Sequence, residues 1–346
     1  MLIFVDDINM PRVDKYANSD FDFLLTCIGS QRLLLLRYGT QQPIALLKLL
    51  IEREGLFNKK DLDWMRVRDI QTLGAMCPAG GARNNLDPRF VSLFSVFCVV
   101  FPPKEALELI YGTILSSKLV GFSNAVSELA GVITESTLAL YAAAAQQLPP
   151  TPSKFHYIFN LRDLSRVFEG LCLATPDRCE TPSQFVRLWR HECLRVFHDR
   201  LLSDADKRVV NASIERLVRS NFGQHTGLIE TVLAEPIVFG DFQHIQKNDD
   251  GEEAVRLYED LLDYERIKPI FEQQLEVYNA SQKAGKELQL VMFEDALEHL
   301  ARIHRVLRLA RGNLLLVGPG GSGKRSLTQL GSFVAGCSMF EIVLTR

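Results

Sequence analysis

Three absences narrow the class of protein before any motif is considered. The seven cysteines among the 346 residues form no CxxC pair, so we expect neither a zinc ribbon nor a disulfide framework. The 39 basic side chains nearly balance the 42 acidic ones, which argues against broad electrostatic capture of nucleic acid or anionic membrane. No apolar run reaches the roughly 20 residues of a membrane-spanning helix, and the first residues do not resemble a signal peptide. We therefore expect a soluble protein of a reducing intracellular compartment, with no nucleic-acid and no membrane partner.

The composition is typical of a globular protein with hydrophobic cores. Hydrophobic residues make up 47% of the sequence and charged residues 23%, so hydrophobic cores can form. The length leaves room for about two domains of roughly 100 to 200 residues each.

A glycine-rich motif lies near the C-terminal end of the chain. The apolar run 312–317 leads directly into it, and a helical pattern continues from it to Ala335. Strand, glycine-rich loop and helix in this order are typical of a phosphate-binding loop, whose backbone N–H groups surround the phosphates while a lysine reaches their oxygens. The residues expected to bind nucleotide are Gly318, Pro319, Gly320, Gly321, Ser322, Gly323, Lys324, Arg325 and Ser326. The alternative is an ordinary glycine-rich turn.

One position of this motif departs from the GxxxxGK[ST] pattern. Arg325 stands where a serine or threonine hydroxyl would bind Mg²⁺, and Ser326 follows one residue later. The departure weakens the case for Mg²⁺ ligation, and hence for hydrolysis, more than the case for nucleotide binding.

A second signal lies at the N-terminal end. The apolar run 2–5 is followed by Asp6 and Asp7, the form of a Walker B strand, whose first carboxylate holds Mg²⁺ through water and whose second polarises the attacking water. Acidic residues follow many strands, so the pattern alone is weak. In a P-loop domain the phosphate loop comes before the Walker B strand, whereas here it comes far after it. The simplest explanation is a chain that begins inside one NTPase module and ends inside the next.

Motifs along nearly the whole chain, in order, resemble an axonemal-type dynein heavy chain. The segments VDDINMP (5–11), YGTQQPIALL (38–47), AMCPAGGARN (75–84) and PRF (88–90) resemble its third AAA+ module, and HYIFNLRDLSRV (156–167) resembles the lid of that module. The segments PIVFGDF (236–242), VMFEDALEH (291–299), RIHRV (302–306) and the phosphate loop resemble the start of the fourth module. The resemblance implies an α/β fold of P-loop NTPase AAA+ modules, with a parallel sheet flanked by helices and an α-helical lid, in two partial modules in tandem.

The resemblance assigns roles to the acidic pair. Asp6 is the expected metal ligand of the third module, and Asp7 stands where many AAA+ ATPases carry a catalytic glutamate. The shorter Asp7 side chain implies slow hydrolysis or a bound nucleotide. Cys77 stands at the sensor I position, where a thiol is a poor donor. An inert, buried cysteine is an equally good interpretation of Cys77.

Two arginines complete the expected catalytic set. Arg89 resembles an arginine finger, which projects into the site of the neighbouring module; its alternative is a surface arginine that packs on Phe90. Arg162 resembles sensor II, which reaches from the lid to the γ-phosphate; its alternative is an ion pair with Asp163 or a nearby acid.

Residues 17–37 interrupt the family pattern. The segment is either a genuine surface loop or a translated intron. Its run Leu33–Leu36 favours the intron, because an exposed apolar loop would promote aggregation. We assign the segment no function.

We predict three parts along the chain: a partial α/β subdomain over 1–102, a helical lid over 103–230 and the beginning of the next module over 231–346. Helical spacing predicts helices over 104–116, 121–147 and 153–173, and a charged helical region over 259–289. Thr181 is the predicted N-cap of a further helix. The inner face of this helix is expected to consist of Phe185, Leu188, Trp189, Cys193, Val196 and Phe197.

The resemblance also implies a function. It is that of a segment of a dynein motor ring, with ATP or ADP and Mg²⁺ as cofactors at regulatory modules that support minus-end-directed motility in the cytoskeleton of cilia and flagella. The implied partners are neighbouring AAA+ modules, dynein intermediate and light chains, and microtubules through a stalk outside these residues. The alternative is a non-catalytic structural segment that holds nucleotide without hydrolysis or only packs against its neighbours. Because each module is partial, we expect no complete Mg-ATP site within one copy and little or no nucleotide binding by the chain alone, although the parent protein would be an ATPase.

Overall fold

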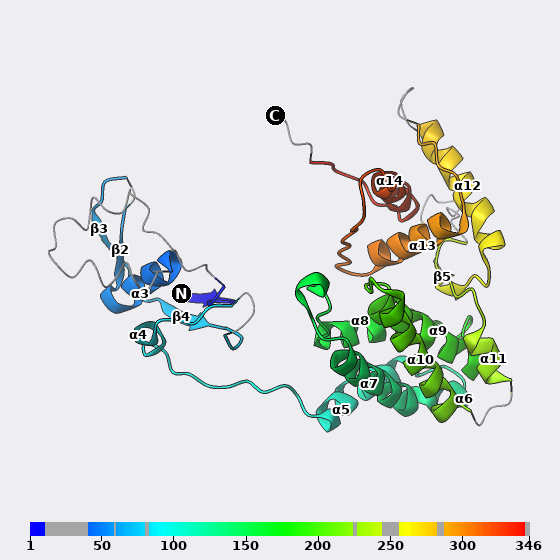
Figure 1. Cartoon of the computed structure of the whole chain (residues 1–346), viewed down its shortest axis with the longest axis horizontal. Helices are drawn as coiled ribbons and strands as arrows, with labels where there is room; N and C mark the ends of the chain where they lie inside the picture. Colours follow the sequence, from blue (N-terminus) through cyan, green and yellow to red (C-terminus); the bar gives the residue numbers. More distant parts are fainter. Residues whose placement is uncertain are drawn as a thin grey trace. The chain divides into compact units, whose positions relative to one another are not determined.

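The computed structural model describes residues 1–10, 41–58, 60–79, 83–223, 227–243, 256–281 and 287–342. The inserted segment 17–37 therefore lies outside the described residues. The chain divides into two compact units, 1–101 and 102–346 (Figure 1). The finer division into three parts stays a prediction.

A two-stranded parallel sheet forms the centre of the first unit. β1 (Leu2–Val5) pairs along its whole length with β4 (Gln71–Gly74), so the strand predicted over residues 2–5 is confirmed. Parallel strands end at the same edge of a sheet, and the chain segments that leave them therefore run side by side. The Ile8 N–H accordingly donates to the Ala75 carbonyl at 3.0 Å.

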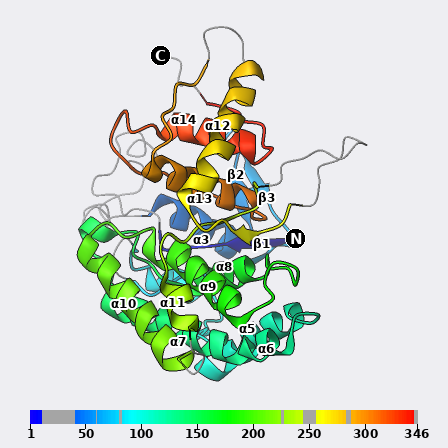
Figure 2. The ribbon, with the colours of Figure 1, turned by 90° about the vertical axis from the view of Figure 1, so that its right-hand side faces the viewer.

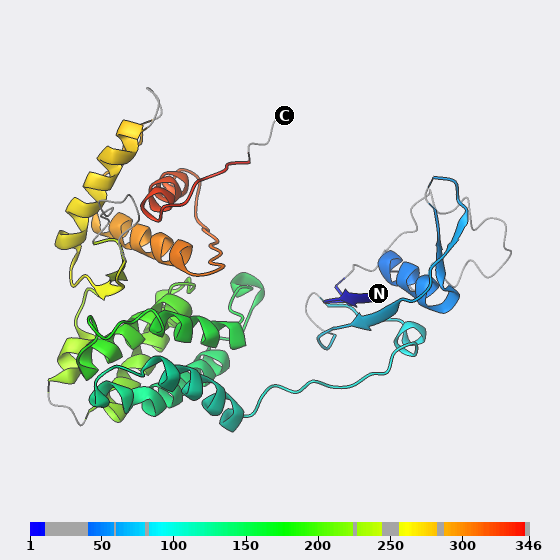
Figure 3. The same cartoon turned by 180° about the vertical axis from the view of Figure 1, so that it is seen from behind.

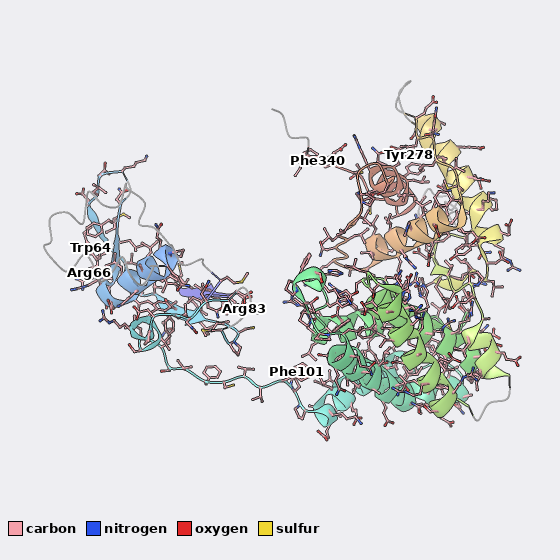
Figure 4. All side chains as sticks on the ribbon, viewed as in Figure 1. Trp64, Arg66, Arg83, Phe101, Tyr278 and Phe340 are labelled. Atoms are coloured by element: carbon pink, nitrogen blue, oxygen red, sulfur yellow. The ribbon has the colours of Figure 1, made fainter. Side chains whose placement is uncertain are left out.

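In the described part of the first unit, the other elements are one helix, one hairpin and one short turn of helix. The elements are α3 (Gln42–Arg53), β2 (Gly55–Phe57), β3 (Trp64–Arg66) and α4 (Pro88–Val91). Strands β2 and β3 form an antiparallel hairpin whose second strand carries the side chains of Trp64 and Arg66 (Figure 4). The buried core of the described part of this unit is small: it comprises Ile8, Ile44 and Phe90.

A bundle of helices forms the larger part of the second unit (Figure 3). The helices are α5 (Lys104–Lys118), α6 (Asn124–Ser127), α7 (Leu129–Gln147), α8 (Leu161–Leu171), α9 (Pro182–Cys193), α10 (Asp204–Asn221) and α11 (Leu228–Leu233), with a 3₁₀ turn η1 (Pro152–Lys154) and a π turn η2 (Leu194–His198). Trp189 lies in the centre of this bundle, fully buried, and its indole N–H donates to the Thr137 hydroxyl at 2.8 Å. The six residues predicted for the inner face of α9 and its continuation are all buried, which confirms that prediction.

Capping residues fix where α8 and α9 begin. Thr181 accepts from the Gln184 N–H and the Gln184 side chain accepts from the Thr181 N–H, a capping box that confirms the predicted start of α9. Asn160 and Asp163 form the same device at α8. The helix predicted over 153–173 is therefore wrong for 155–160, because the Asn160 cap starts the helix only at Leu161.

Beyond the bundle, the described residues of the second unit form three helices, α12, α13 and α14 (Figure 2), and a short two-stranded antiparallel sheet. The elements are β5 (Phe239–Gly240), β6 (Glu259–Asp260), α12 (Tyr264–Ser281), α13 (Glu294–Arg308) and α14 (Lys324–Val334). Helices α13 and α14 lie directly against each other: a Cβ at Gly331 of α14 would lie 2.8 Å from the Ile303 side chain of α13. A core of apolar side chains joins the three helices, and its fully buried members include Phe242, Ile267, Phe271, Leu300 and Leu330.

The apolar run 312–317 does not form the predicted strand. It has no strand partner within the described residues, and Leu315 and Val317 are each 84% exposed. A strand needs a neighbour to satisfy its backbone groups, and the described part of the second unit offers none at this position. The predicted helix after the loop is present as α14.

Buried charges join α9 to the elements that follow the bundle. Arg187 donates to Asp260 at 2.5 Å and to the carbonyls of Thr231, Ala234 and Pro236. Glu192, fully buried, accepts from Arg305 of α13 and from the Tyr258 hydroxyl. Burial alone would raise the pKa of Glu192, but Arg305 overrides this effect and lowers it to about 2. The carboxylate therefore stays ionised and ties the bundle to α13.

None of the helices among the described residues is long and apolar enough to cross a membrane.

Candidate functional site

The loop 318–323 and the first turn of α14 form the candidate phosphate-binding site. The Lys324 ammonium lies over the loop and donates to the carbonyl of Gly318 at 2.9 Å, to the carbonyl of Pro319 and to the Ser322 hydroxyl. Gly321 and Gly323 have φ angles of +76° and +74°, which glycine adopts without strain. The ammonium and the N-terminus of α14 thus meet at one loop, where both favour an anion.

A cavity of about 330 Å³ opens beside this loop. It is mostly apolar, with two polar side chains from α13 and two loop residues in its wall. The lining residues are Leu290, Val291, Phe293, Asp295, Ala296, His299, Ser322, Gly323 and Leu327. No sequence motif predicts this cavity. Its only sequence signal is the apolar stretch before α13, which the fold brings against the loop.

The two residues after Lys324 lie at different places on α14. Arg325 is exposed, and its guanidinium donates to Glu341 at 2.6 Å. Ser326 is half-buried. Neither hydroxyl nor carboxylate therefore stands at the motif position that would ligate Mg²⁺.

The acidic pair lies at the end of β1. Asp6 is exposed, and its carboxylate accepts from the Asp7 N–H at 3.0 Å. Asp7 has a φ of +48°, a left-handed conformation that is uncommon for a residue with a side chain. The Asp7 carboxylate accepts from the Arg83 guanidinium at 3.0 Å, and this bond is the largest cause of a raised pKa at Arg83 (Figure 4). No local sequence signal pairs Arg83 with Asp7, because the two residues come together only when β1 pairs with β4.

The loop after β1 is fixed to the loop after β4. Asn9 is fully buried, its side-chain amide donates to the Cys77 carbonyl at 2.8 Å, and its own carbonyl accepts from the Asn84 N–H at 3.0 Å. The Cys77 side chain is exposed, so the interpretation of Cys77 as a buried apolar residue is wrong.

An Asp6 carboxylate could take part in binding a hydrated Mg²⁺, but no cluster of three or more His, Cys, Asp or Glu residues that could hold a metal occurs in the described part of the chain.

Arg89 lies on α4 with its side chain exposed. The Asp87 carboxylate caps this short helix by accepting from the Arg89 N–H at 2.9 Å, and Phe90 beside it is buried in the small core. The guanidinium of Arg89 has no hydrogen-bond or ion-pair partner among the described residues. It is therefore available to a group from outside the first unit.

Arg162 lies in the first turn of α8 and is also exposed. The ion pair with Asp163 that the sequence allowed is absent from the described residues. Asp163 is buried and binds Arg200 at 2.5 Å and Arg166 at 3.2 Å, in addition to capping α8. Asp163 therefore has a structural role, and the Arg162 side chain has no charged partner in the described second unit.

The structure brings some of the predicted site residues together and leaves others apart. Asp6 and Asp7 are adjacent at the end of β1, and the nine residues 318–326 form one continuous loop and helix start. No hydrogen bond or ion pair joins Arg162 to this loop in the part of the second unit that the structure describes. Fold and site together define a P-loop protein of the AAA+ class with a helical lid.

Comparison with known proteins gives the particular family. A model described as a P-loop containing dynein motor region matches residues 35–102, one described as a P-loop containing dynein motor region D4 matches 288–346, and a AAA+ lid domain model matches 133–226. The chain is 52% identical over its full length to the dynein-1-alpha heavy chain of the flagellar inner arm I1 complex of Chlamydomonas reinhardtii. It is 50% and 38% identical, again over its full length, to the human dynein axonemal heavy chains 10 and 6.

The chain belongs to the family of axonemal dynein heavy chains. It spans 7 to 8% of the length of these three relatives. The predicted fold class, AAA+ P-loop modules with a helical lid, is confirmed.

Proposed function

We propose that this chain forms part of an axonemal dynein motor ring and binds ATP or ADP at the loop 318–326. Because the loop and the cavity beside it are formed entirely by residues of this chain, we propose that the chain alone binds nucleotide, in place of the expectation of little or no binding. One observation carries the proposal: the Lys324 ammonium, the N-terminus of α14 and the 330 Å³ cavity adjoin at a single loop. The ammonium and the helix end suit the phosphates, and the apolar wall of the cavity suits the flat base.

The acidic pair and Arg162 are proposed to serve the nucleotide site of the third module, and Arg89 is proposed to serve the site of a neighbouring module. Asp6 would hold hydrated Mg²⁺ and Asp7 would polarise the attacking water. Arg89 would extend to the site of a neighbouring module and Arg162 to the γ-phosphate. Both guanidinium groups are exposed and have no polar partner among the described residues, which supports these roles.

The similarity to axonemal dynein heavy chains supports a proposal for the partners and the location. We propose that the ring acts through neighbouring AAA+ modules of the same heavy chain, with intermediate and light chains attached and microtubules bound through the stalk. The site of action would be the cytoskeleton of the axoneme in cilia and flagella, with minus-end-directed motility as the output.

The alternative function is a structural ring segment that binds nucleotide without hydrolysing it. The pairing of Asp7 with Arg83 favours it for the first unit, because the guanidinium occupies a carboxylate oxygen that would otherwise orient the attacking water. The buried Glu192–Arg305 contact favours it for the second unit, since it fixes the bundle to α13.

Substitution of Lys324 tests the proposed nucleotide site. Lys324→Ala should abolish saturable binding of a fluorescent ADP analogue by the chain, because it removes the only side-chain ammonium within the loop. Lys268→Ala, on the exposed face of α12, is the matched control and should leave binding unchanged. In a full-length heavy chain, Lys324→Ala should change motility. Unchanged binding in the Lys324 variant would contradict the proposal.

A further inference from the structure

The residue that follows Lys324 does not fit the metal that nucleotide usually brings to a P-loop. In the usual pattern a serine or threonine hydroxyl at this position donates a lone pair to Mg²⁺. Arg325 has five N–H donors and no acceptor, and it carries a fixed positive charge. The loop therefore presents a cation where Mg²⁺ would bind.

Ser326 does not replace the missing hydroxyl. Successive residues of a helix project about 100° apart around its axis, so Ser326 points away from the direction that Arg325 takes. The exposure of the two residues agrees: Arg325 is exposed at the start of α14, whereas Ser326 is half-buried.

The Arg325 side chain can exchange its partner for a phosphate. The Arg325 side chain is 69% exposed, and its guanidinium pairs with Glu341, whose side chain is 38% exposed. Ion pairs between exposed groups contribute little to stability, so this contact can be given up at small cost. A phosphate offers the same guanidinium two parallel hydrogen bonds and more charge.

The helix itself gives no reason for an arginine at this position. The N-terminal turn of a helix carries a partial positive charge and is stabilised by acidic rather than basic side chains. Arg325 therefore opposes the dipole of α14, and only Glu341 offsets this in the described residues. An incoming anion would offset it far more effectively.

We propose that this loop binds the nucleotide in its metal-free form, with the Arg325 guanidinium in the place of Mg²⁺ at the phosphates. The inference rests on the proposed function, since it concerns the same loop. Free ADP and ATP keep the full charge of their phosphates, whereas Mg²⁺ neutralises two of those charges and repels Arg325. The loop therefore prefers the free nucleotide to its magnesium complex.

The test is a titration of the complete 346-residue chain with a fluorescent ADP analogue, once in excess EDTA and once in excess Mg²⁺, at equal ionic strength. We expect a Kd at least threefold lower in EDTA. Arg325→Ser restores the usual hydroxyl and should reverse the preference, while Arg325→Gln, which removes the charge alone, should abolish it. Arg266→Gln, an exposed arginine of α12, is the matched control and should behave as the unchanged chain.

The outcomes separate the inference from the function on which it rests. A Kd in Mg²⁺ equal to or lower than that in EDTA, with binding still lost in Lys324→Ala, overturns the metal-free preference and leaves the nucleotide site standing. Binding that survives Lys324→Ala in both buffers, or no binding in either, overturns the nucleotide site and the inference with it. The comparison of the two buffers needs no variant, so it does not depend on how a variant folds.

Discussion

Two histidines of the second unit are buried among groups that favour their neutral form. His191 on α9 is 2% exposed and His304 on α13 is fully buried. Burial is the largest cause that lowers the pKa of each to about 4. Glu192 beside His191 and Asp241 beside His304 raise the pKa values in part but do not cancel the effect of burial. Nδ1 of His304 lies 3.3 Å from a carboxylate oxygen of Asp241.

Because of these two histidines, we expect the folded chain to lose stability in mild acid. In the unfolded chain a histidine has a pKa of about 6.5 and takes up a proton that the folded state does not bind. Each histidine therefore contributes to the free energy of unfolding above pH 6.5, and this contribution is lost as the pH falls towards 4. The loss should be roughly 3 kcal/mol for each histidine. Urea unfolding between pH 7.5 and 4.5 measures this slope. His304→Asn should make it shallower, whereas His299→Asn, an exposed position of the same helix, should not.

At the scale of elements, α8 and α9 lie tightly against each other at Gly170. A Cβ at Gly170 of α8 would lie 1.8 Å from Oε2 of Glu192, the same carboxylate that Arg305 binds. Glu192 cannot move aside without breaking its contacts to Arg305 and Tyr258. The glycine therefore provides the space in which the buried ion pair forms.

Gly170→Ala should destabilise the chain by about 1–3 kcal/mol, because the added methyl group collides with a buried, hydrogen-bonded side chain. Gly131→Ala in α7 is the matched control: no atom lies within 4 Å of its added Cβ, so alanine should stabilise the helix by about 0.5–1 kcal/mol. Urea unfolding compares the two variants. Equal effects at both positions would contradict the role assigned to Gly170.

The elements also show which sequence signals suffice and which do not. Thr181 and the apolar face of α9 are local signals, and they predicted that helix correctly. The run 312–317 has the same apolar character as a strand, but a strand also depends on a partner that the run itself does not contain. Arg83 reaches Asp7 across 76 positions of sequence, and only the register of β1 with β4 reveals it. The sequence therefore predicts elements that depend on neighbouring residues, such as α9. It does not predict features that depend on pairing between distant segments, such as the contact of Arg83 with Asp7.

At the scale of the whole molecule, the two units differ in the size of their cores. In the described residues the first unit buries three apolar side chains in its cluster, whereas the second unit contains two extensive clusters built on at least eight helices. The first unit also exposes Val96, Phe97, Val99 and Val100 by 74 to 83% on the segment that follows α4. Burial of apolar surface is the main stabilising contribution, so the first unit should be much the less stable of the two.

The two tryptophans of the chain report on the two units separately. Trp64 lies on β3 of the first unit and is 42% exposed, whereas Trp189 is buried in the bundle of the second. In urea, the fluorescence of Trp64 should change at a lower concentration than that of Trp189, because the small core loses its stability first. Trp64→Phe leaves Trp189 as the sole reporter and should keep only the later transition, while the far-ultraviolet circular dichroism still shows both. A single transition at one urea concentration for both tryptophans would mean that the units unfold as one cooperative body, and that the small core of the first unit is stabilised by more than its own buried side chains.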